Sequence, residues 1–137
     1  MFLYALEPPP RRAAAPRSPA ADRGRELFVE HCRSCHVNEV MSGPPVDAAT
    51  LGTDPELASS PSRGTGKYRP AALVRVGAAA PYLHHGAVPT LEDLLGPDRF
   101  EPVAARGRPR VPVRGHRYGV DLAPADRAAI AAYLRTL

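Results

Sequence analysis

The stretch Cys32-Arg33-Ser34-Cys35-His36 decides how the rest of this sequence is interpreted. It holds the only two cysteines among the 137 residues, two residues apart and followed at once by a histidine. Two thiols at this spacing lie on one helical turn, so each can add to a vinyl group of a porphyrin. The histidine that follows then lies beneath the iron as its proximal ligand. We therefore predict one covalent haem c, held by Cys32 and Cys35 with His36 on the iron.

Three other uses of the cysteines fit the sequence less well. A thioredoxin-type redox pair follows a strand in a βαβ unit, and the sequence has no such pattern. A zinc site requires four ligands, so His84 and His85 would have to complete it, and adjacent Cys35 and His36 rarely both reach one ion. A disulfide across two residues is strained. A haem-free metal or thiol site at Cys32 and Cys35 is therefore kept as the alternative.

The composition indicates one small domain whose own side chains form only a modest core. Ala (23 residues) and Pro (17) are abundant, Trp is absent, and only 8 residues are Phe or Tyr. The prolines exclude a long coiled coil, and no apolar run is long enough to span a membrane. A covalent haem would supply the missing apolar volume, so we expect the haem-free chain to be poorly folded.

The basic residues of the chain are almost all arginines. The net charge is +4, and Lys67 is the single lysine among 18 basic residues. Five of the arginines cluster between residues 106 and 117. No nucleic-acid motif or interleaved aromatic residues accompany them, so we expect a solvated loop and no nucleic-acid partner. A redox partner protein could still dock on this surface.

The hydrophobic pattern predicts an all-α fold with few helices around the haem and long loops between them. One helix begins near Asp22 and runs into the cysteine motif, with Ser18 and Pro19, or Asp22 itself, as its cap. A brief helix is predicted at residues 90–95. Residues 42–66 are rich in Gly, Pro, Ser and Thr and are predicted as a loop.

The last helix of the chain has the clearest pattern, over residues 124–137. Pro124 suits its first turn, and Asp126 is favoured there by the helix dipole. Its apolar side chains recur at helical spacing and form one face, made by Ile130, Tyr133, Leu134 and Leu137.

The sixth iron ligand has several candidates among the side chains of the sequence. Met41 follows the motif too closely to round the haem edge, and His31 adjoins Cys32 on the same helix. His84 and His85 lie in one loop that could cover a haem face. His116 lies in a glycine-flanked loop just before the last helix, from which it could reach the opposite face.

Four stretches of the sequence carry a resemblance to a known family. They are residues 24–36, 66–70 and 80–91, and residues 115–119 with the terminal helix. The Pro81-Tyr82-Leu83-His84 segment is the most specific of them. Together they resemble the C-terminal haem half of bacterial di-haem cytochrome c peroxidase-like proteins, in the branch related to rubber oxygenase. The resemblance implies a cytochrome c-like domain over residues 22–137, with electron transfer as its function and haem-dependent peroxidase or oxygenase activity as the alternative.

The same resemblance implies roles for two further histidines and for the N-terminal segment. His116 corresponds to the distal iron ligand, and His84 to a residue near the haem that does not bind iron. Residues 1–21 resemble the end of a preceding domain and a linker, which implies that an N-terminal haem domain is missing from this chain. Haem c is attached outside the bacterial cytoplasm, so we expect a periplasmic location, although residues 1–21 lack the pattern of a signal peptide.

Overall fold

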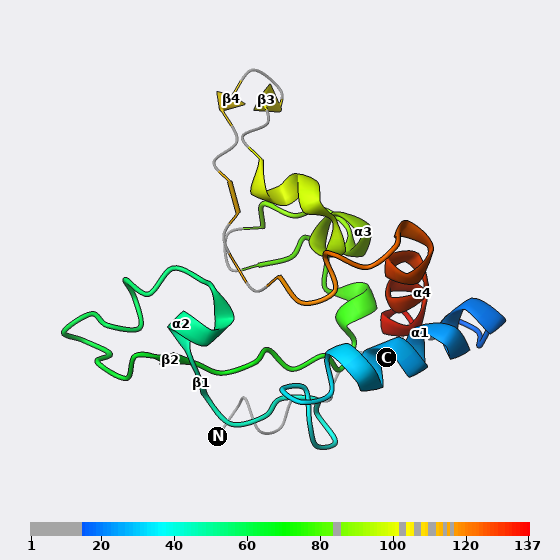
Figure 1. Ribbon diagram of the computed structural model, residues 1–137, viewed down its shortest axis with the longest axis horizontal. Helices are drawn as coiled ribbons and strands as arrows, with labels where there is room; N and C mark the ends of the chain where they lie inside the picture. Colours follow the sequence, from blue (N-terminus) through cyan, green and yellow to red (C-terminus); the bar gives the residue numbers. More distant parts are fainter. Residues whose placement is uncertain are drawn as a thin grey trace, which may run out of the picture.

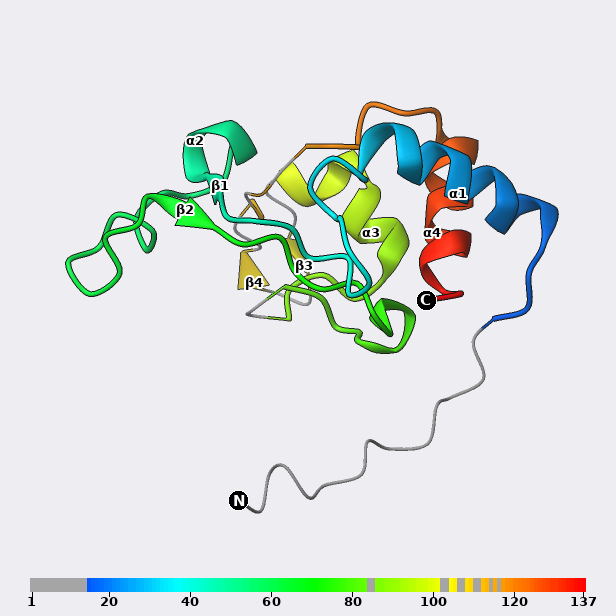
Figure 2. The same ribbon diagram turned by 90° about the horizontal axis from the view of Figure 1, so that it is seen from below.

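The computed structural model describes residues 15–83, 86–101, 104–105, 108–109, 112–113, 115 and 117–137. Two groups of elements lie at opposite ends of the molecule in both views (Figures 1 and 2). One group contains α1 (Pro19–His31), α3 (Leu91–Leu95) and α4 (Pro124–Leu134). The other contains β1 (Val46–Asp47), α2 (Ala48–Leu51) and β2 (Lys67–Tyr68). The chain between and beyond them forms mostly loops, with two short 3-10 helices, η2 (Val76–Ala78) and η3 (Pro97–Phe100), and the strands β3 (Ala104–Ala105) and β4 (Arg108–Pro109).

Helix α1 begins three residues before the predicted start at Asp22. The side chain of Ser18 accepts a hydrogen bond from the backbone N–H of Ala21 at 3.2 Å. Pro19 occupies the first turn, where its missing N–H costs nothing and its fixed φ suits the helix. Of the two predicted caps, Ser18 with Pro19 is therefore the one the helix uses.

Helix α1 packs directly across α4, and the two helices cross along the body of α1, not at its motif end (Figure 2). A Cβ atom at Gly24 would lie only 1.9 Å from the carbonyl oxygen of Ala129, so a side chain there would force the helices apart. The rings of Phe28 and Tyr133 lie 5.3 Å apart between their centroids across this contact. The crossing thus depends on a glycine at its closest point.

The core lies between these helices and α3. It is formed mainly by buried side chains of α1, α3, α4 and the loop before α3, and its largest fully buried side chains are those of Phe28, Val88, Leu91 and Ile130. The predicted apolar face of the last helix is confirmed, since its four members are buried or packed against this core. The helix ends at Leu134, short of the predicted residue 137, so Leu137 packs from beyond its end. Among the described residues, none of the helices combines the length and apolar character that a membrane crossing requires.

Helix α3 agrees with the brief helix predicted at residues 90–95. The hydroxyl of Thr90 accepts the backbone N–H of Asp93 at 3.0 Å and so caps the helix. The carboxylate of Glu92 accepts two hydrogen bonds of 2.6 Å from Nη2 of Arg135, directly after α4. Helix α3 is therefore attached to α4 by an ion pair as well as by apolar packing.

The prediction of an all-α fold misses two short antiparallel strand pairs. Strands β1 and β2 pair Val46 with Tyr68 and Asp47 with Lys67, and β3 pairs with β4 in the same sense. Each strand has two residues, which is too short for an alternating pattern to be recognised in sequence. Helix α2 likewise lies within residues 42–66, where a loop was predicted, because four residues carry too little periodicity to identify it.

Candidate functional site

The Cys32–His36 motif forms the turn that ends α1. The backbone N–H of Cys32 still donates to the carbonyl of Phe28, at 2.9 Å. The carbonyl of Cys32 then accepts the N–H groups of Cys35 at 3.2 Å and of His36 at 3.0 Å. The motif is therefore one continuous turn, and its histidine ring lies 6.2 Å from the ring of Phe28 between centroids.

Both cysteines are free thiols and both are half-buried. Burial, followed by the proximity of Cys35, raises the pKa of the Cys32 thiol to about 11. The thiol of Cys32 is therefore harder to ionise than that of an ordinary cysteine. Within the described part of the chain, no cluster of three or more His, Cys, Asp or Glu side chains could hold a metal ion.

The ring of His36 is oriented by one backbone hydrogen bond. Its Nδ1 lies 2.9 Å from the carbonyl oxygen of Met41. A carbonyl oxygen can only accept, so Nδ1 carries a proton, and in the neutral form of the ring the lone pair is then on Nε2. A neutral histidine fixed in this tautomer is a typical metal-binding histidine, with a carbonyl as the partner of its other nitrogen.

The Met41 carbonyl is placed by the motif loop, which we define as residues 37–43. Asn38 organises this loop with φ at +67°, a left-handed conformation that Asn adopts more readily than most residues. Its side-chain Oδ1 accepts the N–H of Val40 at 3.0 Å and of Ser42 at 3.3 Å. Its Nδ2 donates to the carbonyl of Ser42 at 2.5 Å, and its own carbonyl accepts the N–H of Met41 at 3.2 Å.

Sequence reasoning missed the role of this loop. Met41 was considered only for its thioether, whereas its backbone carbonyl is the group that contacts His36. A signal was nevertheless present, because Asn stabilises tight turns by bonding to the backbone two residues on. An Asn two residues after the motif histidine therefore predicts a turn that returns the chain to the imidazole.

The motif loop is closed against the motif by Gly43. The N–H of Gly43 donates to the carbonyl of Cys35 at 3.0 Å, and a Cβ atom at Gly43 would lie 2.4 Å from that carbonyl oxygen. From the other side, Nη1 of Arg69 donates to the carbonyl of Gly43 at 2.9 Å. The hydroxyl of Ser42 donates to the carbonyl of Pro70 at 2.7 Å. Residues 69–70 thus support the loop from outside.

The other predicted site residues lie outside the described part of the chain. This applies to His84 and to His116, and also to His85. The two neighbours of His116, Gly115 and Arg117, are described. Arg117 lines a groove of about 480 Å³ together with His31, the residue before Cys32. The groove therefore connects the end of α1 with the segment that follows His116.

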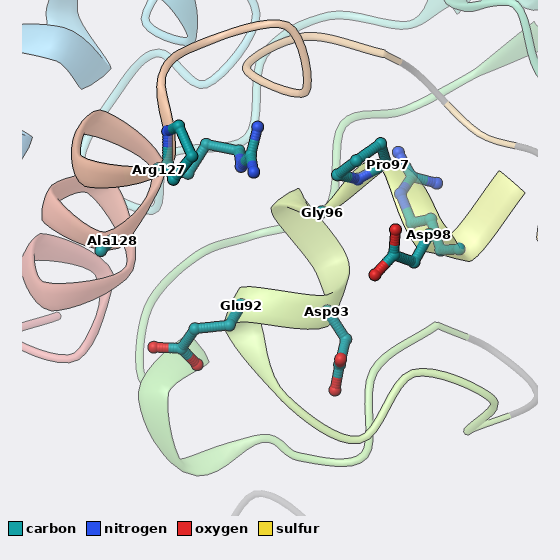
Figure 3. Close-up of a pocket in the computed structure, with 9 residues that line it drawn as sticks. Glu92, Asp93, Gly96, Pro97, Asp98, Arg127 and Ala128 are labelled. Carbon is teal, nitrogen blue, oxygen red and sulfur yellow. The ribbon is translucent and has the colours of Figure 1, made fainter.

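A second cavity, of about 290 Å³, lies away from the motif. Its described lining residues come from α3, η3 and α4, and Figure 3 shows Glu92 and Asp93 on one side with Arg127 across from them. Arg127 also donates to the carbonyls of Val120 at 3.0 Å and Leu122 at 2.8 Å, which holds the turn before α4. The Arg127 side chain in this cavity therefore has a structural role in the packing around α4.

Part of the chain matches a known protein family. Residues 66–102 match the family described as RoxA-like, cytochrome c-like. No curated protein and no solved structure matches the chain. The matched part includes residues 69–70, which support the motif loop, and all of η3, but not the Cys32–His36 motif. The match makes this part of the chain similar to a cytochrome c-like domain, which suggests haem binding and electron transfer.

Proposed function

We propose that this chain is a c-type haem domain for electron transfer, with thioether bonds at Cys32 and Cys35 and His36 as the proximal iron ligand. The observation that carries the proposal is the hydrogen bond from Nδ1 of His36 to the Met41 carbonyl at 2.9 Å. It leaves Nε2 available for iron and increases the basicity of the ring, as is usual for histidine ligands. The two free thiols of the same turn are the groups through which haem c is attached.

Each of these residues has a distinct task. Each cysteine thiol adds across one vinyl double bond: the sulfur bonds to one carbon, the proton ends on the other, and no oxidant is consumed. The bound haem supplies an iron that takes up and releases one electron. The Met41 carbonyl holds the His36 ring in a fixed orientation, so little reorganisation accompanies a change of iron charge. The contact between α1 and α4 keeps the motif turn against the core.

We further propose His116 as the distal iron ligand and His84 as a neighbour of the haem. The support is the resemblance of the Gly-His-x-Tyr-Gly segment, together with the groove that connects His31 to Arg117. By the same resemblance, the chain is the C-terminal half of a periplasmic, di-haem peroxidase-like protein that works with a redox partner. The alternative of a haem-free zinc or thiol site uses the same two free thiols.

The direct test is haem staining after denaturing electrophoresis. The chain is exported into the periplasm of a host that matures c-type cytochromes, and the pyridine haemochrome spectrum is recorded. We expect covalent haem in the parent protein and its loss in the Cys32→Ser, Cys35→Ser double variant. His31→Ala is the matched control, because this histidine adjoins the motif and should retain the haem. An unstained parent band under these conditions would refute the proposal.

The electron-transfer role is tested separately from haem attachment. We expect a haem that is low-spin, cycles reversibly between ferric and ferrous states, and does not consume peroxide in the presence of a reduced donor. Sustained peroxide turnover by the isolated chain would contradict this role and favour the enzymatic alternative. His36→Ala removes the proximal ligand in either role and should change the haem spectrum in both, so it serves as the positive control for coordination.

A further inference from the structure

The 3-10 helix η3 contacts the chain on both sides of His116. The carbonyl of Arg99 accepts the N–H of Val113 at 2.7 Å, and Nη1 of Arg99 donates to the carbonyl of Val113 at 3.3 Å. These two bonds run in opposite directions between the same pair of residues. They attach the chain three residues before His116 to η3.

The contact continues at the two immediate neighbours of His116. A Cβ atom at Gly115 would lie 3.1 Å from Nη1 of Arg99, so the glycine allows the guanidinium to approach the backbone. The guanidinium of Arg117 lies over the ring of Phe100, 4.5 Å from its centroid, and that of Arg99 lies 4.1 Å from the same centroid. We call the described residues 112–113, 115 and 117–119 the Gly115 segment.

The contacts of the Gly115 segment with η3 recur at three described positions. Val113, Gly115 and Arg117 are every second residue, and each of them contacts Arg99 or Phe100. The Gly115 segment is therefore held against η3 at each of these three positions.

The burial of the Arg99 guanidinium against the Gly115 segment is energetically unfavourable in itself. Its side chain belongs to a residue only 4 % exposed, and burial, followed by the proximity of Arg117, lowers the pKa of its guanidinium. Burying a cation beside another cation is unfavourable unless the geometry compensates for it. An apolar side chain would fill the same space without the free-energy cost of desolvating a charge. We therefore attribute the arginine at this position to its directional hydrogen bonds and its stacking on an aromatic ring.

We propose that Arg99 and Phe100 are positioning residues for the distal iron ligand, because they fix the chain on both sides of His116. This inference rests on the proposed function, in which His116 binds the iron. Arg99 and Phe100 touch neither iron nor haem in this role. They act through the backbone at Val113 and Gly115 and through the side chain of Arg117.

The test compares distal coordination in variants of the haem-loaded chain. Arg99→Gln removes the charged donor to Val113, and Gly115→Ala places a methyl group against Nη1 of Arg99. In both we expect covalent haem as in the parent, a larger high-spin ferric fraction, and faster CO binding to ferrous haem. The rate should rise about tenfold, as for the loss of one charge-assisted hydrogen bond. Arg63→Gln is the matched control, because Arg63 also lies over an aromatic ring, that of Tyr68, far from η3.

A double variant separates positioning from a general loss of packing. Arg99→Lys removes the guanidinium nitrogen that a methyl group at residue 115 would meet. We therefore expect Gly115→Ala to raise the CO rate less in the Arg99→Lys background than in the parent. Additive effects of the two substitutions on the CO rate would contradict a direct contact between these residues and overturn the inference.

The remaining outcomes distinguish this inference from the proposed function. His116→Ala should give the full high-spin spectrum. If it does, and the Arg99 and Gly115 variants keep the parent spectrum, the positioning role is wrong while His116 stands as the ligand. If His116→Ala keeps the parent spectrum, both the distal assignment and the positioning role fall. Covalent haem at Cys32 and Cys35 would be unaffected by either result.

Discussion

The motif loop and the Gly115 segment are each proposed to position an iron ligand, but contacts of different kinds hold the two segments in place. The motif loop places the Met41 carbonyl against His36 through hydrogen bonds that Asn38 makes within four residues of itself. The Gly115 segment is held instead by residues far away in sequence, since Arg99 and Val113 are 14 positions apart. The difference teaches that the proximal side of the proposed site is locally encoded, whereas the distal side depends on the rest of the fold.

The largest expected effect is at the closure of the motif loop. In Gly43→Ala the new methyl group would meet the carbonyl oxygen of Cys35 at 2.4 Å, and backbone cannot move aside as a side chain can. We expect a loss of about 3 kcal/mol in unfolding free energy, as for severe overpacking. Haem incorporation should fall with it. Chemical denaturation of the haem-loaded protein measures the first quantity, and haem staining the second.

A second glycine provides the control for this prediction. A Cβ atom at Gly52 meets no described atom within 4 Å, but its φ is +64°. Gly52→Ala should therefore cost only the conformational strain of about 1 kcal/mol. If both variants lose the same stability, the tight contact between Gly43 and Cys35 is not what holds the motif loop.

The second prediction concerns Asn38 and separates its two contributions. Asn38→Gly keeps the left-handed backbone but loses the three side-chain hydrogen bonds, whereas Asn38→Ala loses both. Asn38→Asp retains the acceptor oxygen that binds Val40 and Ser42. We expect stability losses of about 1–2 kcal/mol for Gly, more for Ala and less for Asp.

The same variants should change the midpoint potential of the haem. A looser Met41 carbonyl weakens the hydrogen bond from Nδ1 and makes the imidazole a poorer electron donor to iron. The potential should therefore rise, in the order Ala, Gly, Asp, from largest to smallest shift. Redox titration followed by absorbance measures this order. Equal potentials in all three variants would mean that the motif loop has no influence on His36.

This comparison also explains how far the sequence could predict the molecule. The motif turn, the capped start of α1 at Ser18, helix α3 and the apolar face of α4 each depend on residues close in sequence, and each was predicted. The strand pairs and the Arg99 contacts depend on partners that only the folded chain brings together. Arg99 itself is one arginine among 17, and its burial has no signature in the sequence.

A smaller effect is expected where Arg117 stacks on Phe100. Phe100→Leu keeps an apolar side chain but removes the aromatic face under both guanidinium groups. Stacking of this kind contributes about 0.5–1 kcal/mol at partly exposed sites. A double-mutant cycle with Arg117→Gln should recover a coupling energy of this size from unfolding free energies. A coupling near zero would limit the support of the Gly115 segment to Arg99.

The smallest effect is expected at Glu92, which attaches α3, and through it η3, to the end of α4. The hydrogen bond from Arg135 lowers the pKa of the Glu92 carboxyl below its ordinary value of 4.5. A carboxyl with a lowered pKa in the folded state stabilises the fold when ionised, so its contribution is present above about pH 4.5 and is lost as the pH falls. Both side chains are about half-exposed, at 51 % for Glu92 and 41 % for Arg135, so solvent limits the gain to about 0.5 kcal/mol.

Glu92→Gln should therefore reduce the unfolding free energy slightly at pH 7, and its unfolding free energy should converge with that of the parent at pH 3. If the variant also increases the high-spin fraction at pH 7, the attachment of η3 to α4 contributes to the distal side, as expected of a site that depends on the whole fold.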